Sequence, residues 1–233
     1  MKLKTILRRF LPDFYLYKKN SYSQSGEDLI IDFIFFTLGI TNPTYLDIGA
    51  HHAFSLSNTA IFYKRGNTGV SVEPDPYLWK KLKKYRKNEK TLNFGIGLID
   101  NVVEDFFIVN PPTLNSFSNT EIQKNILDGN CKLVEIKKIV TKTINTLISD
   151  NFEHCPNLIS LDIEGMDYDV LKTFDFTKFR PDVFCIETLT FSNERKGVKK
   201  HNILELMKDK GYIIYADTFI NTIFINQERW QKP

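Results

Sequence analysis

The sequence has few of the features that mark secreted, fibrous or membrane-spanning chains. Its 233 residues include only three cysteines, Cys131, Cys155 and Cys185, and these form no CxxC pair. An odd number of cysteines at irregular spacing is a poor disulfide framework, so we expect a reducing, cytoplasmic location. The longest apolar run, residues 29–40, is interrupted by Asp32 and is too short to cross a bilayer. The 31 basic and 28 acidic residues nearly balance, so the charge does not indicate a nucleic-acid partner.

No Pro-, Gly- or Ser-rich linker and no internal repeat divides the chain, so residues 23–233 are expected to form a single domain. Residues 1–22 are a separate basic segment. Its first residues begin like a signal peptide but lack a long apolar region and a cleavage site. We interpret them as a short amphipathic helix that Pro12 ends. Docking onto the domain is the favoured role of this helix, and weak contact with an anionic membrane surface is the alternative.

Short strand-like runs alternate with helix-like segments along the chain, which predicts an α/β fold with a mostly parallel, doubly wound sheet. Strands are expected over residues 44–49, 69–74, 91–97, 157–165 and 182–189 and around Ile213 and Ile223; helices are expected over 26–39 (capped by Ser25), 55–64, 76–87, 168–174 and 202–210. Residues 102–109 and 133–140 break the alternation because both are strand-like. They predict a β-hairpin insertion, about residues 102–140, carrying a long polar loop that serves either as a substrate lid or as filler.

The turn after the first expected strand predicts a cofactor site. Asp47, Gly49 and Ala50 end this strand, and Glu73 ends the next one. In open α/β sheets a glycine turn lets a ligand approach the backbone, and an acid on the second strand bonds a ribose. The turn has Ala50 and Ala53 where a dinucleotide fingerprint would have glycines, so a nicotinamide oxidoreductase is the weaker alternative. A carboxylate at Asp47 suits a cofactor with an ammonium and a sulfonium, which favours S-adenosylmethionine.

A second group of residues could carry acid–base chemistry. Asp162 and Glu164 follow one buried strand and Glu187 ends its neighbour, so these carboxylates should meet at one edge of the sheet. Such a cluster supplies a base or holds a divalent cation, Mg²⁺ or Mn²⁺, with Asp162 and Glu187 as the first ligands; capping or loop-bonding is the structural alternative. His51 and His52 lie in the cofactor turn, where an imidazole could accept a hydroxyl proton.

Three blocks of this sequence resemble the FkbM family of S-adenosylmethionine-dependent methyltransferases: SQSGEDLI (23–30), DIGAHHAFSLSNTAIFYKRGNTGVSVEPDP (from Asp47) and LISLDIEGMDYDVL (158–171). The resemblance spans about residues 23–226. It implies a Rossmann-like class I methyltransferase fold with a C-terminal antiparallel strand, and usually O-methylation of a hydroxyl on a sugar or natural product. Many members have Asn and Gly where this chain has His51 and Ala53. The cofactor contacts assigned here are Gln24, Glu27, Asp47, Gly49, Ala50, Glu73 and Asp100.

The sequence therefore predicts an S-adenosylmethionine-dependent O-methyltransferase that acts on a sugar, nucleotide sugar or glycan. The candidate bases are His51 or His52, followed by Asp162 and Glu187. Substrate contacts are expected from Glu164 and from the polar loop at Asn115 and Ser116, whose side chains suit sugar hydroxyls. The alternative is a noncatalytic protein that binds a glycan or a partner through a degenerate methyltransferase fold.

Overall fold

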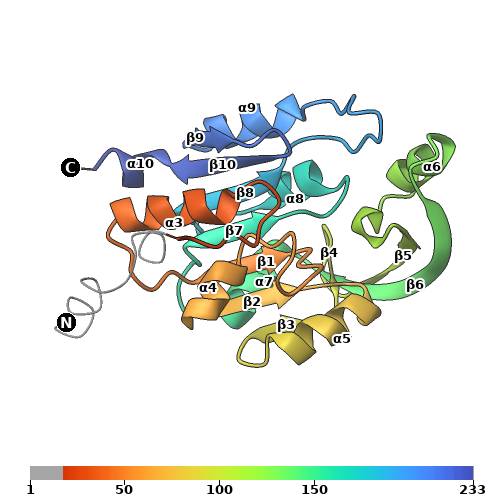
Figure 1. Ribbon diagram of the computed structural model, residues 1–233, viewed down its shortest axis with the longest axis horizontal. Helices are drawn as coiled ribbons and strands as arrows, with labels where there is room; N and C mark the ends of the chain where they lie inside the picture. Colours follow the sequence, from red (N-terminus) through yellow and green to blue (C-terminus); the bar gives the residue numbers. More distant parts are fainter. Residues whose placement is uncertain (1–17, 233) are drawn as a thin grey trace.

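A seven-stranded sheet forms the centre of the computed structural model, which describes residues 18–232 (Figure 1). The strand order is β3-β2-β1-β7-β8-β10-β9; all neighbouring pairs are parallel except those made by β10, which runs antiparallel to β8 and β9. The strands are β1 (Tyr45–Ile48), β2 (Gly69–Val72), β3 (Lys90–Leu92), β7 (Leu158–Leu161), β8 (Val183–Glu187), β9 (Tyr212–Asp217) and β10 (Asn221–Asn226). The mostly parallel, doubly wound sheet with an antiparallel C-terminal strand is confirmed.

Helices cover both faces of this sheet. One apolar core forms where α3 (Glu27–Thr37) and α4 (Ala60–Arg65) pack on the sheet, and a second forms on the opposite face beneath α7 (Ile144–Asn151), α8 (Asp167–Thr173) and α9 (His201–Asp209). Strands β1, β2, β7 and β8 are buried along their whole length because both faces are covered, which explains their short, nearly continuous apolar runs. The remaining helices of the described chain are α5 (Pro76–Tyr85), α6 (Asn119–Leu127) and α10 (Gln227–Trp230).

A smaller sheet projects beside the main one and contains the expected insertion (Figure 1). Strand β5 (Val102–Asn110) pairs antiparallel with β6 (Lys132–Lys142), and β4 (Gly95–Ile96) pairs parallel with β6. The predicted hairpin is confirmed. The loop that it carries contains a 3₁₀ turn, η1 (Pro112–Leu114), and helix α6, which Ser118 caps by accepting a hydrogen bond from the Glu121 amide.

Three local predictions need correction. Residues 91–97 do not form one strand, because the chain leaves β3 at Asn93, whose side chain bonds the Glu73 and Pro74 carbonyls, and enters the second sheet at β4. Helix α4 starts at Ala60 rather than at residue 55. The α3 cap is Gly26 rather than Ser25, and the hydroxyl that bonds the Gly26 amide belongs to Ser23. Helix α7 was not predicted.

No helix in residues 18–232 is long and apolar enough to span a bilayer. Cys131, Cys155 and Cys185 are free cysteines in the structure. The expected amphipathic helix at the N-terminus lies outside the described residues, so its docking or membrane role stays a prediction.

Candidate active site at the carboxyl ends of the strands

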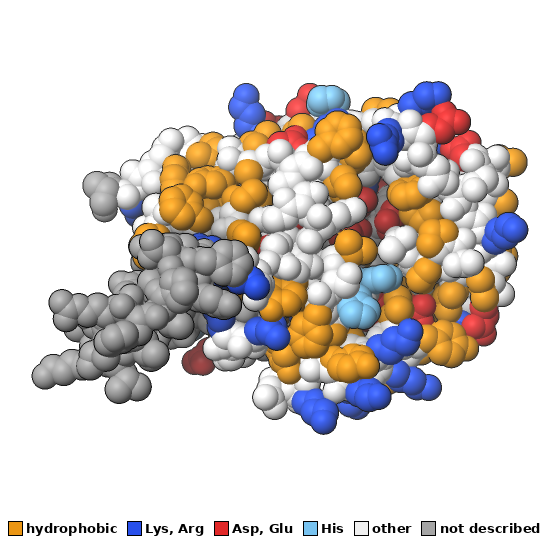
Figure 2. Space-filling view, viewed as in Figure 1, with side chains coloured by type: hydrophobic (Ala, Val, Ile, Leu, Met, Phe, Trp, Pro, Cys, Tyr) orange, Lys and Arg blue, Asp and Glu red, His pale blue; other side chains and the backbone are white. Residues whose placement is uncertain are grey.

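A cavity of about 490 Å³ opens at the carboxyl ends of the central strands. Gly49, Glu73, Asp162 and Glu187, which follow or end β1, β2, β7 and β8, line one wall. Residues 112–117 of the insertion and 189–192 after β8 line the opposite side. Figure 2 shows acidic side chains inside a hollow on this face and histidine side chains at its border. The cavity has a size typical of small-molecule sites, and it lies where open α/β sheets bind ligands.

Gly49 is required by the close approach of two strand ends. Its φ is 77°, in the left-handed region, and a Cβ atom built on it would lie 1.8 Å from the Asp162 carbonyl oxygen. The Gly49 amide bonds the Val72 carbonyl, which fixes the turn to β2 as well. The absence of a side chain therefore keeps the tips of β1 and β7 together and leaves the floor of the cavity open.

Glu73 lies at the tip of β2 with its carboxylate in the cavity wall and only 4% of the residue exposed. Its two oxygens accept hydrogen bonds of 2.8 Å from the backbone amides of His51 and Asp75. Burial raises the pKa of Glu73 to about 8, although these two amides oppose the shift. The carboxyl group is therefore fixed in orientation, and its free lone pairs are available to a ribose.

The two histidines of the turn have different environments. His51 has a φ of 46° and lines the cavity, and neither of its ring nitrogens has a hydrogen-bond partner among residues 18–232. Burial, then the charge of His52, lower the pKa of His51, so its imidazole is neutral at pH 7. His52 is exposed and outside the cavity lining, and its Nδ1 accepts a hydrogen bond from the Phe54 amide. The structure therefore does not place His52 where a catalytic base would act.

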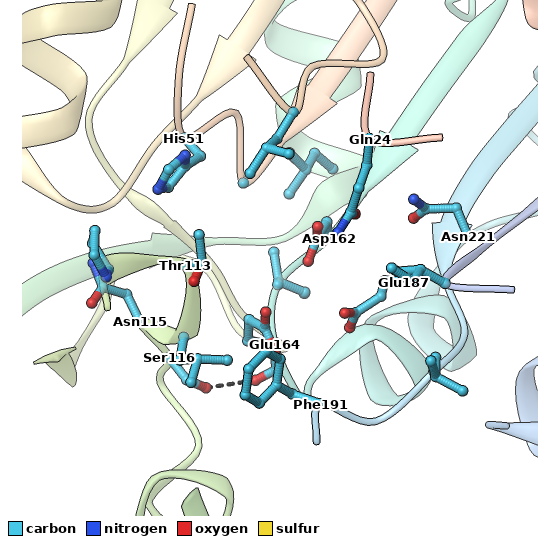
Figure 3. Close-up of a pocket in the computed structure, with 18 of the residues that line it drawn as sticks. Gln24, His51, Thr113, Asn115, Ser116, Asp162, Glu164, Glu187, Phe191 and Asn221 are labelled. Atoms are coloured by element: carbon cyan, nitrogen blue, oxygen red, sulfur yellow. Dashed lines mark hydrogen bonds between the residues drawn. The ribbon is translucent and has the colours of Figure 1, made fainter. Parts of the chain in front are cut away.

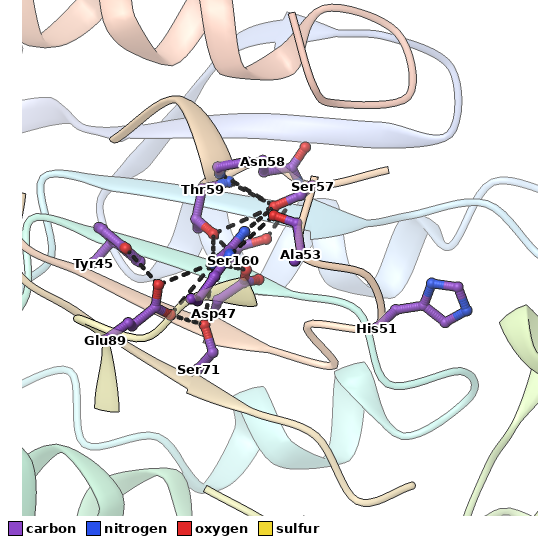
Figure 4. Close-up of polar contacts among 12 residues, drawn as sticks. Tyr45, Asp47, His51, Ala53, Ser57, Asn58, Thr59, Ser71, Glu89 and Ser160 are labelled. Carbon is purple, nitrogen blue, oxygen red and sulfur yellow. Dashed lines mark hydrogen bonds and ion pairs between the residues drawn. The ribbon is translucent and has the colours of Figure 1, made fainter. Parts of the chain in front are cut away.

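Asp47 does not reach the cavity, contrary to the prediction of a direct cofactor contact. Its carboxylate points to the α4 side of the sheet, where Ser71 and Ser160 occupy the matching positions of the neighbouring strands (Figure 4). It accepts a hydrogen bond from Thr59 and lies 3.6 Å from the Arg86 guanidinium. The side chain is thus part of a buried polar network beneath the turn.

Arg86 is the centre of this network and is fully buried. Its guanidinium donates to the Ala53 carbonyl at 3.0 Å and to Ser57 at 2.7 Å, and it forms an ion pair of 3.2 Å with Glu89. Burial raises the pKa of Glu89, and Arg86 opposes the shift. Arg86 therefore holds residues 53–59, which follow the cofactor turn, against the carboxylates below them.

Three carboxylates meet at the other end of the cavity, as the strand order predicts. Asp162, Glu164 and Glu187 each contribute an oxygen, and these oxygens all lie within 4.8 Å of one another. Figure 3 shows Asp162 and Glu187 pointing into the same space, with Gln24 and Asn221 beside them. Asp162 is exposed to the cavity.

Lys200 neutralises part of this acidic cluster. Its ammonium donates to Glu187 at 2.9 Å and to Asp167 at 3.1 Å. Burial raises the pKa of Glu187 to about 7 against the influence of Lys200. Burial and the Glu187 carboxylate also raise the pKa of Asp162 and Glu164 well above the ordinary range. Glu187 can therefore exchange a proton near neutral pH, and the protonated forms of Asp162 and Glu164 are favoured beside it.

The other predicted residues are divided between the cavity and the framework. Gln24 lines the cavity, whereas Glu27 is buried behind it and bonds Thr218 and Asn221. Ala50 is packed under α5. Asp100 lies outside the lining because it bonds Thr143 and Thr146 at the start of α7, so the structure does not support it as a cofactor contact.

The substrate candidates Asn115 and Ser116 line the cavity, but their side chains are engaged by the fold. Asn115 bonds the Val109 amide and donates to Asp75 at 2.9 Å. Ser116 donates to the Glu164 carbonyl at 2.6 Å. These bonds attach the insertion to the start of α5 and to the loop that follows β7. The insertion therefore forms a fixed wall of the cavity.

Several cavity residues were not predicted from the sequence: Asn58, Phe117, Phe191 and Asn221. Arg195 also lines the cavity, and no ion pair is found for it within residues 18–232. The other basic residues near it all form ion pairs: Lys196 with Glu194, Lys199 with Asp217, and Lys200 with Glu187. The basic cluster of 195–200 is visible in the sequence, but only the fold shows which member is unpaired.

The residues present fit S-adenosylmethionine. Gly49 leaves room against the backbone, Glu73 presents a carboxylate to a ribose, and His51 offers unpaired nitrogens in the same cavity. When bound, this cofactor supplies a methyl group activated by a positively charged sulfur.

The fold and this site define a Rossmann-like class I methyltransferase. The family model of the methyltransferase FkbM domain matches residues 47–214, so the chain belongs to this family of S-adenosylmethionine-dependent methyltransferases. A comparison with curated proteins finds no match.

The chain is also similar to several solved structures. The chain is similar to a TehB-like SAM-dependent methyltransferase from Corynebacterium glutamicum, with 12% identity, 96% of this chain and 97% of that chain covered, and a TM-score of 0.43. An O-methyltransferase from Bacillus cereus in complex with SAH has 9% identity, 96% and 88% coverage and a TM-score of 0.45. A S-adenosylmethionine-dependent methyltransferase from Clostridium acetobutylicum has 11% identity, 97% and 99% coverage and a TM-score of 0.43.

Proposed function

We propose that this methyltransferase acts on a hydroxyl group of a sugar, nucleotide sugar or glycan. The observation that carries the proposal is the cluster of Asp162, Glu164 and Glu187, which shares one cavity with Glu73 and Gly49. An alkyl hydroxyl is a weak nucleophile, so its proton must be accepted as the bond to carbon forms. Glu187, whose pKa is raised to about 7, can accept that proton.

Glu187 is the best candidate for the base. Its pKa of about 7 means that a large fraction is ionised at neutral pH, and Lys200 fixes one of its oxygens. Proton transfer to Glu187 leaves a neutral carboxyl group between Lys200 and Asp162. The pKa of Asp162 and that of Glu164 are also raised, and their protonated forms can donate hydrogen bonds to the acceptor oxygen and orient it.

The rest of this end of the cavity suits a carbohydrate. Phe191 and Phe117 supply aromatic surface, and Asn221 supplies an amide. Arg195 adds an unpaired guanidinium to the lining of the described cavity, which would favour an acceptor that carries a phosphate, such as a nucleotide sugar.

A divalent cation at Asp162 and Glu187 is the alternative means of activating the hydroxyl. Lys200 argues against it, because its ammonium already occupies one oxygen of Glu187 and would repel a second positive charge. We therefore favour the metal-free reaction.

The test is transfer of an isotopically labelled methyl group from S-adenosylmethionine to sugar, nucleotide-sugar and glycan acceptors, followed by mass spectrometry of the product. The proposal predicts a label on a sugar oxygen that is lost in Glu187→Gln. Lys196→Ala is the matched control, since this lysine pairs with the exposed Glu194 and does not line the cavity. A label on nitrogen or carbon would contradict the proposal. Cofactor-independent glycan binding without transfer would instead favour the noncatalytic alternative.

A further inference from the structure

His51 has an unused pair of hydrogen-bonding atoms inside the cavity. Nδ1 and Nε2 are both buried, and neither has a partner among residues 18–232. A buried polar group without a partner is energetically unfavourable, so such a side chain in a ligand cavity indicates a contact that a ligand completes. Figure 4 shows the ring turned away from the Asp47 network, which therefore does not account for it.

The position of His51 assigns it to one end of the cavity. Its backbone amide bonds Glu73 at 2.8 Å, and Figure 3 shows its ring on the side of Thr113 and Asn115. Asp162 and Glu187 lie on the other side in the same view. The charges that act on His51 are those of His52, Asp75 and Lys81, and none belongs to the acidic cluster. A base must be within hydrogen-bond reach of the proton that it accepts, and His51 is not beside the proposed acceptor site.

We propose that His51 is a nucleoside-binding residue, whose imidazole bonds the adenosine part of the cofactor instead of accepting the proton of the acceptor. A neutral imidazole offers one donor and one acceptor, and adenosine presents both kinds of group on its ribose and its adenine. The apolar residues Val72, Leu78 and Ile96 line the cavity and provide a surface for a planar base. This inference rests on the proposed S-adenosylmethionine site and adds one ligand contact to it.

Binding and turnover separate this role from that of a base. Calorimetry with S-adenosylhomocysteine, in the absence of any acceptor, should show about tenfold weaker binding by His51→Ala, which corresponds to the loss of one or two hydrogen bonds. At saturating cofactor and acceptor, kcat should stay within about twofold of the parent value. The KM for S-adenosylmethionine should rise with the dissociation constant, and His51→Asn should recover part of the affinity because its amide also donates and accepts.

His52→Ala is the matched control, because His52 is the adjacent residue of the same turn, is exposed and does not line the cavity. It should bind the cofactor product as the parent does. Circular dichroism and thermal unfolding of each variant exclude a folding defect.

Unchanged affinity in His51→Ala would overturn the inference, and so would a hundredfold loss of kcat with unchanged affinity, which is the signature of a base. If the parent protein itself failed to bind S-adenosylhomocysteine, the proposed function would fail first. The two failures are therefore distinguishable.

Discussion

Replacing Arg86 with Met should remove the cation that the structure places beside the buried carboxylates of Asp47 and Glu89. Asp47 and Glu89 form ion pairs with Arg86, whose side chain is fully buried. The change also takes hydrogen bonds from the Ala53 carbonyl and the Ser57 hydroxyl. Removing one partner of a buried ion pair costs about 3–5 kcal/mol, a large share of the roughly 5–15 kcal/mol that stabilises a typical domain.

The assay is chemical denaturation of the parent and the variant at pH 8 and at pH 5. Burial raises the pKa of Asp47 and Glu89, and the loss of Arg86 should raise both further. A carboxyl group whose pKa is raised by folding costs stability at pH values above that pKa, and the cost disappears as the pH falls. The destabilisation caused by Arg86→Met should therefore be largest at pH 8 and smaller at pH 5.

Arg65→Met is the matched control, because Arg65 also pairs with a carboxylate, Asp32, but is 48% exposed. Its loss should cost at most about 1 kcal/mol. If Arg86→Met does not fold at pH 8, Arg86→Lys keeps the charge, loses most of the hydrogen bonds and should show an intermediate loss. A cost under about 1 kcal/mol for Arg86→Met, or one that grows as the pH falls, would refute the reasoning.

Three further predictions concern the cavity. Gly49→Ala should destabilise the fold by about 2 kcal/mol or more, since the new Cβ atom would collide with the Asp162 carbonyl. It should also abolish cofactor binding, which calorimetry measures. Gly66 has a similar φ but open surroundings, so Gly66→Ala should lose stability and keep cofactor binding. The activity should rise with pH through about 7 as Glu187 ionises. Glu187→Gln should lower kcat by about 10²–10⁴ and remove this rise from the pH–rate profile. An unchanged profile would exclude Glu187 as the base. Dialysis against EDTA should leave the activity unchanged because Lys200 already pairs with Glu187, whereas a loss restored by Mg²⁺ or Mn²⁺ would establish a metal site.

Much of the fold could be predicted because its central strands are short apolar runs that end at polar or glycine residues. The break between β3 and β4 could not, since residues 91–97 are continuously strand-like and only the tertiary bonds of Asn93 separate them. Helix α6 has a capping signal at Ser118 and Glu121, but the surrounding polar residues read as a loop.

The site was predictable where it depends on strand ends, and less so where it depends on side-chain direction or loops. Gly49, Glu73 and the three carboxylates follow from the order of the strands. Successive side chains of a strand point to opposite faces of the sheet, so Asp47 lies on the same face of β1 as Tyr45. Tyr45 is buried under α3 and α4, and the carboxylate of Asp47 therefore points away from the cavity. Lys200 comes from a loop whose position only the folded chain defines.

The central claim is that one cavity holds the methyl donor at its Glu73 end and the acceptor at its carboxylate end. A crystal structure with S-adenosylhomocysteine bound tests it most directly. The account predicts that the ribose hydroxyls lie within hydrogen-bond distance of Glu73, that His51 contacts the adenosine, and that the sulfur faces the space between Asp162 and Glu187. A ribose bound at the carboxylate end, or a sulfur facing away from Asp162 and Glu187, would contradict it.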